Sequence, residues 1–145
     1  MGFLEAAKKV AGEIAKLREA ILVTHYDCDG IACAWIMKRC LENAGIDHEL
    51  FIAKELTRSV INQLLDFSSP VIFVDLGESK LIEALRQRVF VLDHHSPAGV
   101  RKPNITRLNS MDFAIPELSA SCVAYFVASF MNKANEELAD LAIVG

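Results

Sequence analysis

Apolar residues follow two alternating patterns along the chain. Nearly continuous apolar runs cover residues 20–25, 70–77 and 88–95, and shorter runs suited to strands cover 48–53 and 104–109. Apolar positions at helical spacing predict helices over 3–19, 30–44, 56–66, 79–87, 118–133 and 135–144. Buried strands without polar alternation, joined by helices, are typical of a parallel sheet covered on both faces. We therefore expect an α/β fold: a doubly wound, mainly parallel five-stranded sheet with helices on both faces.

The composition fits one globular domain in a reducing compartment. The chain has 145 residues, 52% of them hydrophobic, and four cysteines that form no C-x-x-C pair. No apolar run approaches the ~18 residues of a membrane span, so we expect a cytoplasmic protein without a membrane partner. The net charge of -4 gives no general basic surface. A nucleic-acid partner would therefore need a local basic patch or bound cations.

Acidic and imidazole side chains follow three of the predicted strands. They are His25, Asp27 and Asp29 after the first, Asp75 after the third, and Asp93, His94 and His95 after the fourth. Ligands bind outside the carboxyl ends of parallel strands, so these groups should meet at one edge of the sheet. If the backbone stays extended beyond Thr24, residues 25, 27 and 29 point to one side, and Gly30 then allows a tight turn into the next helix.

Carboxylates that converge in this way need cations or protons to relieve their repulsion. Two unit charges about 4 Å apart repel by roughly 4 kcal/mol at an effective dielectric constant near 20. Four aspartates with up to three histidines suit a pair of divalent ions, and mixed oxygen and imidazole ligands favour manganese, with zinc or iron also compatible. Two such ions would clamp a phosphate and lower the pKa of a water between them. The pattern predicts a two-metal centre.

The residues at the strand ends match the motifs of a known family. The stretches THYDCDGIACAW (24–35), FVDLG (73–77) and VLDHHSP (91–97) resemble the first three motifs of the DHH phosphoesterases, and ELSASCVAYFVA (117–128) is similar to the serine-bearing segment that follows them. The D-x-D-G form of the first motif is more similar to RecJ-like exonucleases than to the nanoRNA and cyclic-dinucleotide branch. The resemblance covers roughly residues 20 to 145.

The resemblance implies a role for each of these side chains. The implied metal ligands are His25 and Asp27 on one ion, Asp29 on the other, Asp75 between the two, and His94. His95 would contact the scissile phosphate, and Asp93 would hold a histidine by a hydrogen bond. The implied cofactors are two divalent ions, Mn²⁺ first and Mg²⁺ as the alternative. The implied partners are single-stranded DNA or RNA and proteins of replication or repair.

The family's fourth motif, an aspartate just after a segment like LADLAIVG, does not occur within the 145 residues. We expect residues 1–145 to be the N-terminal domain of a longer protein with a C-terminal substrate-binding domain. Alone, the chain is expected to bind metal weakly and to turn over poorly or not at all. The basic residues Arg101, Lys102 and Arg107 are candidate contacts for substrate phosphates, although a solvated loop explains them equally well.

The function that these motifs predict is hydrolysis of single-stranded nucleic acid by a RecJ-like exonuclease. One alternative is a non-catalytic scaffold of the same fold in a replication complex, and another is a nanoRNA or cyclic-dinucleotide phosphodiesterase. A third is a haloacid-dehalogenase-type phosphatase, which also uses D-x-D-G after a strand. The DHH motif and the residues THY before Asp27 argue against this third alternative.

Overall fold

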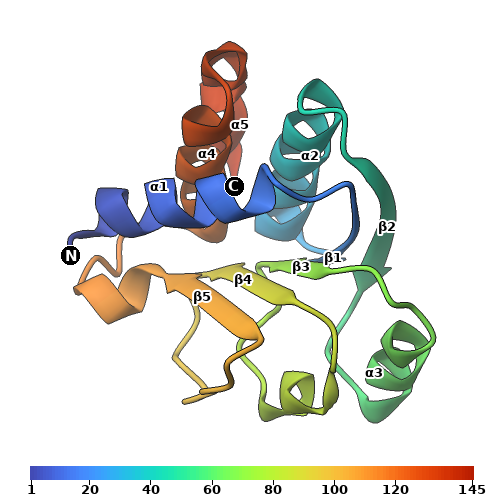
Figure 1. The fold of residues 1–145 in the computed structure, drawn as a ribbon. Coiled ribbons are helices and arrows are strands. Elements are labelled where there is room, and N and C mark those ends of the chain that lie inside the picture. The colour runs from blue at the N-terminus through green and yellow to red at the C-terminus, as the bar shows by residue number, and fades with distance from the viewer.

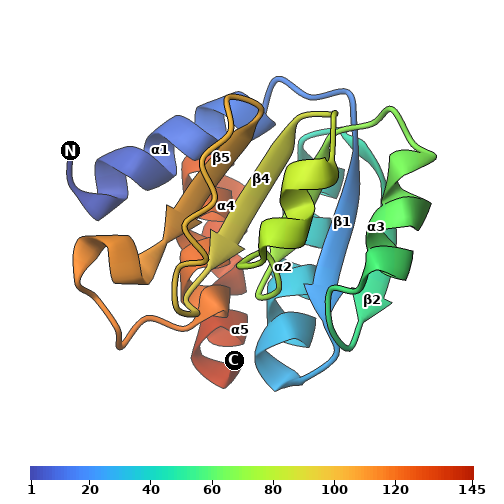
Figure 2. The ribbon, with the colours of Figure 1, turned by 90° about the horizontal axis from the view of Figure 1, so that it is seen from below.

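A parallel five-stranded sheet forms the centre of the molecule. The computed structural model describes all 145 residues, and the strands are β1 (Glu19–His25), β2 (Asp47–Ala53), β3 (Val71–Val74), β4 (Val89–Asp93) and β5 (Ile105–Asn109). Every neighbouring pair is parallel, in the order β2-β1-β3-β4-β5. The carboxyl ends of all five strands therefore lie at one edge of the sheet (Figure 2). The predicted fold class is confirmed.

Helices cover both faces of this sheet. The helices α1 (Phe3–Ile14), α2 (Cys28–Asn43), α4 (Ala120–Met131) and α5 (Ala139–Val144) lie above the sheet in Figure 1, while α3 (Arg58–Leu65) lies below it. The larger core of 26 buried residues belongs to the first face and the smaller core of 11 to the second. Alternate residues of each buried strand point to opposite faces, so Leu22 belongs to the larger core and Val23 to the smaller one.

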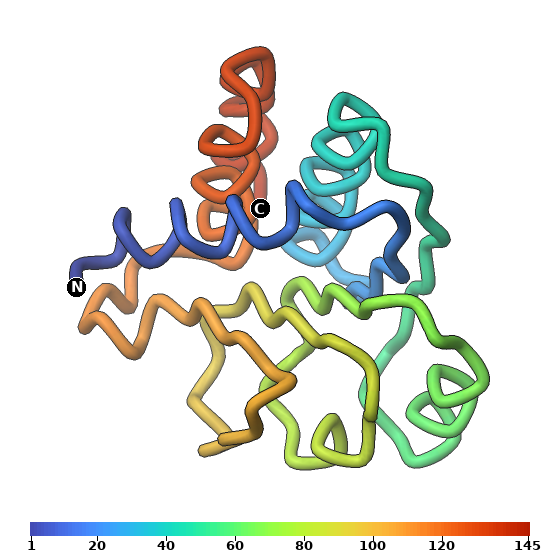
Figure 3. The backbone as a smooth tube through the Cα atoms, in the orientation of Figure 1, coloured from blue at the N-terminus to red at the C-terminus, as the bar shows by residue number.

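The chain path brings the first and last helices together on one face. The backbone trace shows α1 crossing over the sheet beside α4, although the two are separated by more than a hundred residues (Figure 3). Phe3 packs edge to face against Phe113 and Phe126, with ring centroids 5.6 Å apart in both pairs. All four cysteines are free. No helix is both long enough and apolar enough to span a bilayer.

Local structure departs from the predicted pattern in several short segments. The segment 79–87 forms only the short 3-10 helix η1 (Lys80–Ala84), and 3-10 turns η2 (Ser110–Phe113) and η3 (Lys133–Leu138) precede α4 and α5. The helix α2 begins at Cys28, so the backbone is extended only as far as Asp27, and Asp29 lies in the first helical turn. Gly30 serves close approach rather than a turn, because a Cβ there would lie 2.3 Å from the carbonyl oxygen of His25.

Candidate metal centre

The buried carboxylate of Asp75 lies at the middle of the acidic strand ends. Asp75 directly follows β3, is 1% exposed, and has a φ of 57°, in the left-handed region that non-glycine residues rarely adopt. Aspartate tolerates this conformation better than most residues, at a cost of about 1–3 kcal/mol. Strained backbone of this kind is concentrated at functional sites, and here it directs the carboxylate toward the side chains from β1 and β4.

One group of potential ligands comes from β1 and the start of α2. His25 Nδ1 lies 2.8 Å from Asp27 Oδ2 and 3.7 Å from Asp75 Oδ2. Asp27 is also the N-cap of α2, where its Oδ1 accepts a hydrogen bond of 2.9 Å from the Gly30 N–H. One ligand atom from each of the three side chains falls within 4.8 Å of the others, which is close enough to hold one metal ion.

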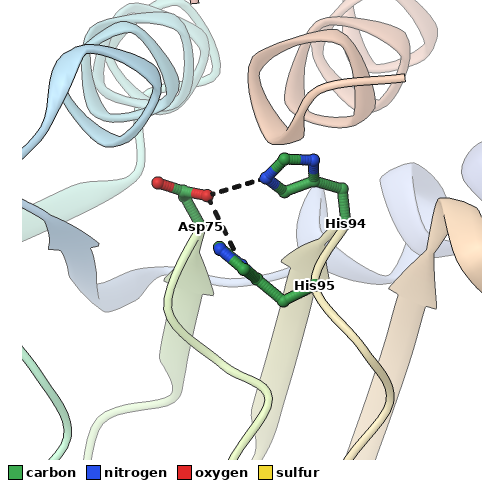
Figure 4. Close-up of side chains that lie close together, drawn as sticks. All are labelled: Asp75, His94 and His95. Carbon is green, nitrogen blue, oxygen red and sulfur yellow. Dashed lines mark ion pairs between the residues drawn. The ribbon is translucent and has the colours of Figure 1, made fainter. Parts of the chain in front are cut away.

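A second group shares Asp75 with the two histidines that follow β4. His94 Nε2 lies 3.4 Å from Asp75 Oδ1, and His95 Nδ1 lies 3.7 Å from the same oxygen (Figure 4). These three side chains also place ligand atoms within 4.8 Å of one another. Asp75 is thus the member common to both groups, with one oxygen facing each.

The carboxylate of Asp93 is saturated with hydrogen bonds inside this cluster. Its Oδ1 accepts from the backbone N–H groups of His94 and His95 at 2.7 and 3.1 Å and lies 2.7 Å from His95 Nδ1. Its Oδ2 accepts from the N–H groups of Gly77 and Glu78 at 2.8 and 3.2 Å. Asp93 therefore orders the loops after β3 and β4, and it fixes the ring of His95.

Asp29 connects the cluster to helix α4. Its Oδ2 lies 3.6 Å from His94 Nε2 and accepts a hydrogen bond of 2.9 Å from the Ala120 N–H, while its Oδ1 accepts one of 2.8 Å from the Ser121 N–H. A carboxylate at a helix N-terminus is favoured by the exposed N–H groups there. Gly145 packs against the same carboxylate, since a Cβ at that position would lie 2.6 Å from Asp29 Oδ1.

The electrostatics of the cluster favour a bound cation. Both oxygens of Asp75 are buried without a hydrogen-bond partner. Burial, followed by the charges of Asp29, Asp27 and Asp93, raises the pKa of Asp75 to about 8. A buried carboxylate with no donor is costly unless a proton or a metal ion satisfies it. The donor set of carboxylate oxygens and imidazole nitrogens fits a divalent metal ion.

Hydrogen bonding distributes the charge of the remaining groups. The hydrogen bond to Asp93 raises the pKa of His95 to about 9 against the opposing effect of burial. Burial alone would raise the pKa of Asp93, but the hydrogen bonds from His95 and from the backbone outweigh it and lower that pKa. The same balance lowers the pKa of Asp27, where burial is outweighed by the Gly30 N–H and His25. Asp93 and His95 therefore form an ionised pair at neutral pH.

A cleft of about 290 Å³ opens beside the cluster. Four residues of the cluster line this cleft, namely His25, Asp75, Asp93 and His95, and its other lining residues are Lys54, Glu55, Leu56, Leu76, Glu78 and Ser79. The sequence analysis did not identify Glu78 as a lining residue of the cleft. The only signal in the sequence is an acidic residue three positions after Asp75, in a loop that leaves a buried strand. Lys54 contributes a cationic side chain to the cleft.

The basic residues after β4 lie outside this lining. Arg101 is exposed, and Lys102 donates a hydrogen bond to the carbonyl oxygen of Glu83. Arg107 is only 16% exposed at its side chain, donates from Nε to Glu78 Oε1 at 2.8 Å, and lies with Nη2 3.0 Å from Asp112 Oδ2. Contact of these three residues with substrate stays a prediction, and the structure engages Arg107 in internal ion pairs.

The family model described as "DHH family, N-terminal domain" matches residues 19–145. The chain belongs to the DHH family. The match spans β1 and every later element, including all seven clustered side chains, and it confirms the family that the sequence motifs indicated. A comparison with curated proteins finds no significant match.

Solved structures with the same fold include members of the RecJ group. A crystal structure of exonuclease RecJ bound to manganese is 24% identical with a TM-score of 0.73, and the match covers 98% of this chain and 41% of that one. RecJ from Thermus thermophilus, in complex with Mn²⁺, is 24% identical with a TM-score of 0.75, covering 97% of this chain and 23% of that one. CDC45 from Entamoeba histolytica is 19% identical with a TM-score of 0.74, and the match covers 96% of this chain and 32% of that one. This DHH domain thus spans less than half the length of these proteins.

Proposed function

We propose that this DHH domain carries the catalytic centre of a metal-dependent phosphodiesterase that hydrolyses single-stranded nucleic acid, as a RecJ-like exonuclease does. The observation that carries the proposal is the buried carboxylate of Asp75, whose two oxygens have no hydrogen-bond partner and face two separate groups of ligands. Membership in the DHH family supports phosphoester hydrolysis as the general class of reaction.

Five side chains would hold two divalent ions at this centre. His25 and Asp27 would bind one ion, Asp29 and His94 the other, and Asp75 both. Ions bound there supply positive charge that clamps a phosphate and lowers the pKa of a water positioned to attack phosphorus. Manganese is the ion that we expect first, because imidazole and carboxylate ligands are mixed, and magnesium is the alternative. RecJ structures solved with manganese and with magnesium support both of these ions as candidates.

His95 would act on the substrate phosphate. Its Nδ1 is held by Asp93 Oδ1, so Nε2 is left to donate a hydrogen bond or a proton to a phosphate oxygen. With a pKa of about 9, the ring carries a proton at neutral pH and presents positive charge to the cleft. Asp93 would keep the ring in this orientation and stabilise its charge, as carboxylates do for catalytic histidines.

The substrate would approach through the cleft beside Asp75. Lys54 offers the phosphate backbone an ion pair inside the cleft, and Arg101 and Lys102 lie on the loop that follows the two histidines. Because the chain as a whole carries a charge of -4, bound metal ions would supply much of the attraction for a polyanion. Single-stranded DNA or RNA in a replication or repair setting is the substrate class that we propose.

Cleavage of labelled single-stranded oligonucleotides during a Mn²⁺ titration tests this function. We expect Mn²⁺ binding and a slow Mn²⁺-dependent release of nucleotides by the wild-type chain, and weaker binding with loss of that release in the variant Asp27→Asn. Asparagine is as good an N-cap as aspartate, so this variant removes a metal ligand charge while helix α2 keeps its cap. The matched control is Asp47→Asn, which removes the same charge at the start of β2, at the opposite edge of the sheet.

The scaffold alternative draws on the likeness in fold to CDC45. It predicts that the chain binds replication proteins equally well with and without Asp27→Asn and cleaves no oligonucleotide at any Mn²⁺ concentration. A substrate panel that includes a cyclic dinucleotide and very short RNAs separates the other alternative. Preference for those short substrates over a long single strand would replace the exonuclease proposal with the nanoRNA or cyclic-dinucleotide one.

A further inference from the structure

A buried carboxylate lies behind the two histidines and plays no part in the proposed metal set. Glu78 follows β3 by four residues, and its side chain is 4% exposed. Its Oε1 accepts hydrogen bonds from Arg107 Nε at 2.8 Å and from Asn109 Nδ2 at 2.7 Å. Its Oε2 accepts one of 2.8 Å from the backbone N–H of Ala98. Both oxygens are thus occupied by donors of the protein.

The donors come from the far side of the loop that carries the histidines. Arg107 and Asn109 both belong to β5 and are two residues apart, so their side chains share one face of the sheet. Asn109 is fully buried, and its Nδ2 also donates a hydrogen bond of 2.9 Å to the carbonyl oxygen of His95. Since β4 lies between β3 and β5, Glu78 reaches across the end of β4 to meet them.

This arrangement fixes the backbone of the loop from both directions. Asp93 accepts the N–H groups of His94 and His95, while Asn109 donates to the His95 carbonyl oxygen. Glu78 accepts the N–H of Ala98, three residues further along. The first residues after β4 therefore have polar backbone groups bonded to three side chains: Asp93 at the end of β4, Glu78 in the loop after β3, and Asn109 in β5. Groups held in this way keep a reactive side chain in one geometry and lose little entropy during a reaction.

We infer that Glu78, Arg107 and Asn109 form a brace of positioning residues that holds the loop after β4 and aims His95 at the substrate phosphate. The inference rests on the proposed function for what His95 does, and on the contacts above for how its loop is held. Arg107 compensates the buried charge of Glu78, because a buried carboxylate without its cation would be strongly destabilising. The charge of Arg107 is thereby used inside the protein, and Asp112 pairs with its other end.

The test uses the variant Glu78→Gln, which keeps the shape of the side chain. An amide can accept from Arg107 and Asn109 with its oxygen, but its NH₂ group then faces the N–H of Ala98 and that hydrogen bond is lost. The matched control is Glu13→Gln, which breaks the ion pair between Glu13 and Arg88 away from the centre. Arg107→Lys is the conservative companion, since it keeps a positive charge next to Glu78.

Amide hydrogen exchange on the metal-free chain measures the brace independently of activity. We expect Glu78→Gln to speed exchange of Ala98 and His95 by about tenfold or more relative to Val91 in β4, as local opening of one loop would. Glu13→Gln should leave that ratio unchanged. Equal acceleration at Ala98, His95 and Val91 would mean that Glu78 contributes only to global stability, and the inference would be wrong.

Kinetics on the Mn²⁺-loaded chain complete the test. We expect Glu78→Gln to lower kcat by about tenfold, with KM changed by less than about twofold, in the range found for residues that orient metal ligands. Arg107→Lys, which keeps the charge and the carboxylate, should lower kcat much less. A wild-type chain that neither binds Mn²⁺ nor shows any Mn²⁺-dependent cleavage would overturn the proposed function and leave the exchange result to decide the brace, whereas full kcat in Glu78→Gln would overturn the brace alone.

Discussion

Asp75 and Asp93 stand at the ends of neighbouring strands and have opposite surroundings. Both are almost completely buried, at 1% and 0% exposure. Asp93 has five nitrogen partners within 3.2 Å, whereas neither oxygen of Asp75 has a hydrogen-bond partner. The pKa of Asp93 is accordingly lowered, and burial raises the pKa of Asp75 to about 8. Burial therefore does not decide the role of a carboxylate in this fold; the supply of donors does.

The difference assigns separate tasks to the two residues. A metal ion could bind Asp93 only by competing with the N–H groups that order the loops after β3 and β4. Asp75 offers its oxygens without such competition, and it sits between the two groups of potential ligands. A saturated carboxylate suits a structural anion, and an unsatisfied one suits a ligand.

The variant Asp75→Asn should separate the two tasks most strongly. We expect Mn²⁺ affinity to fall by more than about 100-fold, beyond the range for residues that only orient ligands. The free energy of unfolding of the metal-free chain should stay the same or rise, because the amide removes a buried carboxylate that has no donor. A Mn²⁺ titration and urea unfolding measure the two quantities, with Asp47→Asn as control. Wild-type Mn²⁺ affinity in Asp75→Asn would remove the basis of the comparison.

The pH dependence of metal binding should follow Asp75 rather than Asp93. Between its unperturbed pKa of 3.8 and its folded pKa of about 8, Asp75 holds a proton in the folded chain that the unfolded chain lacks. The free energy of unfolding of the metal-free chain should therefore decrease as pH rises through this window. Mn²⁺ must displace the same proton, so its affinity should rise by up to about tenfold per pH unit below about pH 8. Titrations at a series of pH values from mildly acidic to about pH 8 measure this slope.

Asp75→Asn supplies the reference for that slope. The amide has no proton to lose in this range, so whatever Mn²⁺ binding remains should vary much less with pH. A wild-type affinity that does not change over the same pH series would show that Asp75 is already ionised in the metal-free chain.

The sequence predicts that Asp75 and Asp93 meet at one edge of the sheet, but it does not predict that only Asp93 has hydrogen-bond donors. Buried strands such as Val71–Val74 and Val89–Asp93 lack polar alternation, which predicts a parallel sheet and hence one edge for Asp75, Asp93 and His94. The donors of Asp93 Oδ2 are Gly77 and Glu78, 16 and 15 residues earlier in the chain. Contacts of that kind depend on how loops pack after the sheet forms, and no local spacing reports them.

Contacts between residues still further apart in the chain could not be predicted from the sequence either. The N–H groups that hold Asp29 belong to residues 120 and 121, more than ninety positions away. Likewise, the helical spacing over 79–87 predicts a helix, but only Lys80–Ala84 is helical, as a 3-10 segment, and Leu85 directly after it is extended. Tertiary packing overrides local propensity in such short segments.

The variant Asp93→Asn should affect stability where Asp75→Asn does not. The asparagine NH₂ group must take the place of one carboxylate oxygen of Asp93 and then faces N–H donors. The hydrogen bonds from Gly77 and Glu78, or those from His94 and His95, are therefore lost. We expect the free energy of unfolding of the metal-free chain to fall by about 3 kcal/mol, as buried donors are left unsatisfied. Urea unfolding at neutral pH gives this value. A loss no larger than that of Asp75→Asn would mean that the five partners contribute nothing specific.

The variant with the smallest expected effect is Gly77→Ala. It tests whether the backbone N–H of Gly77 stabilises the chain through its hydrogen bond to Asp93. A Cβ at position 77 would lie 2.2 Å from Val91 Cγ1, and Val91 is a buried β-branched residue that cannot turn away. In Gly77→Ala the backbone must therefore move, and its N–H leaves Asp93 Oδ2. We expect a loss of about 1–2 kcal/mol in the free energy of unfolding, typical of overpacking.

A double variant separates the steric cause from any other. Val91→Ala removes the two methyl groups that a Cβ at position 77 would meet, so Gly77→Ala should cost much less in that background than in the wild type. Restored slow exchange of the residue 77 amide in the double variant would show that its hydrogen bond to Asp93 has reformed. Additive losses would instead show that contact with Val91 is not the cause of the cost, and the contrast between Asp93 and Asp75 would then rest on the side chains alone.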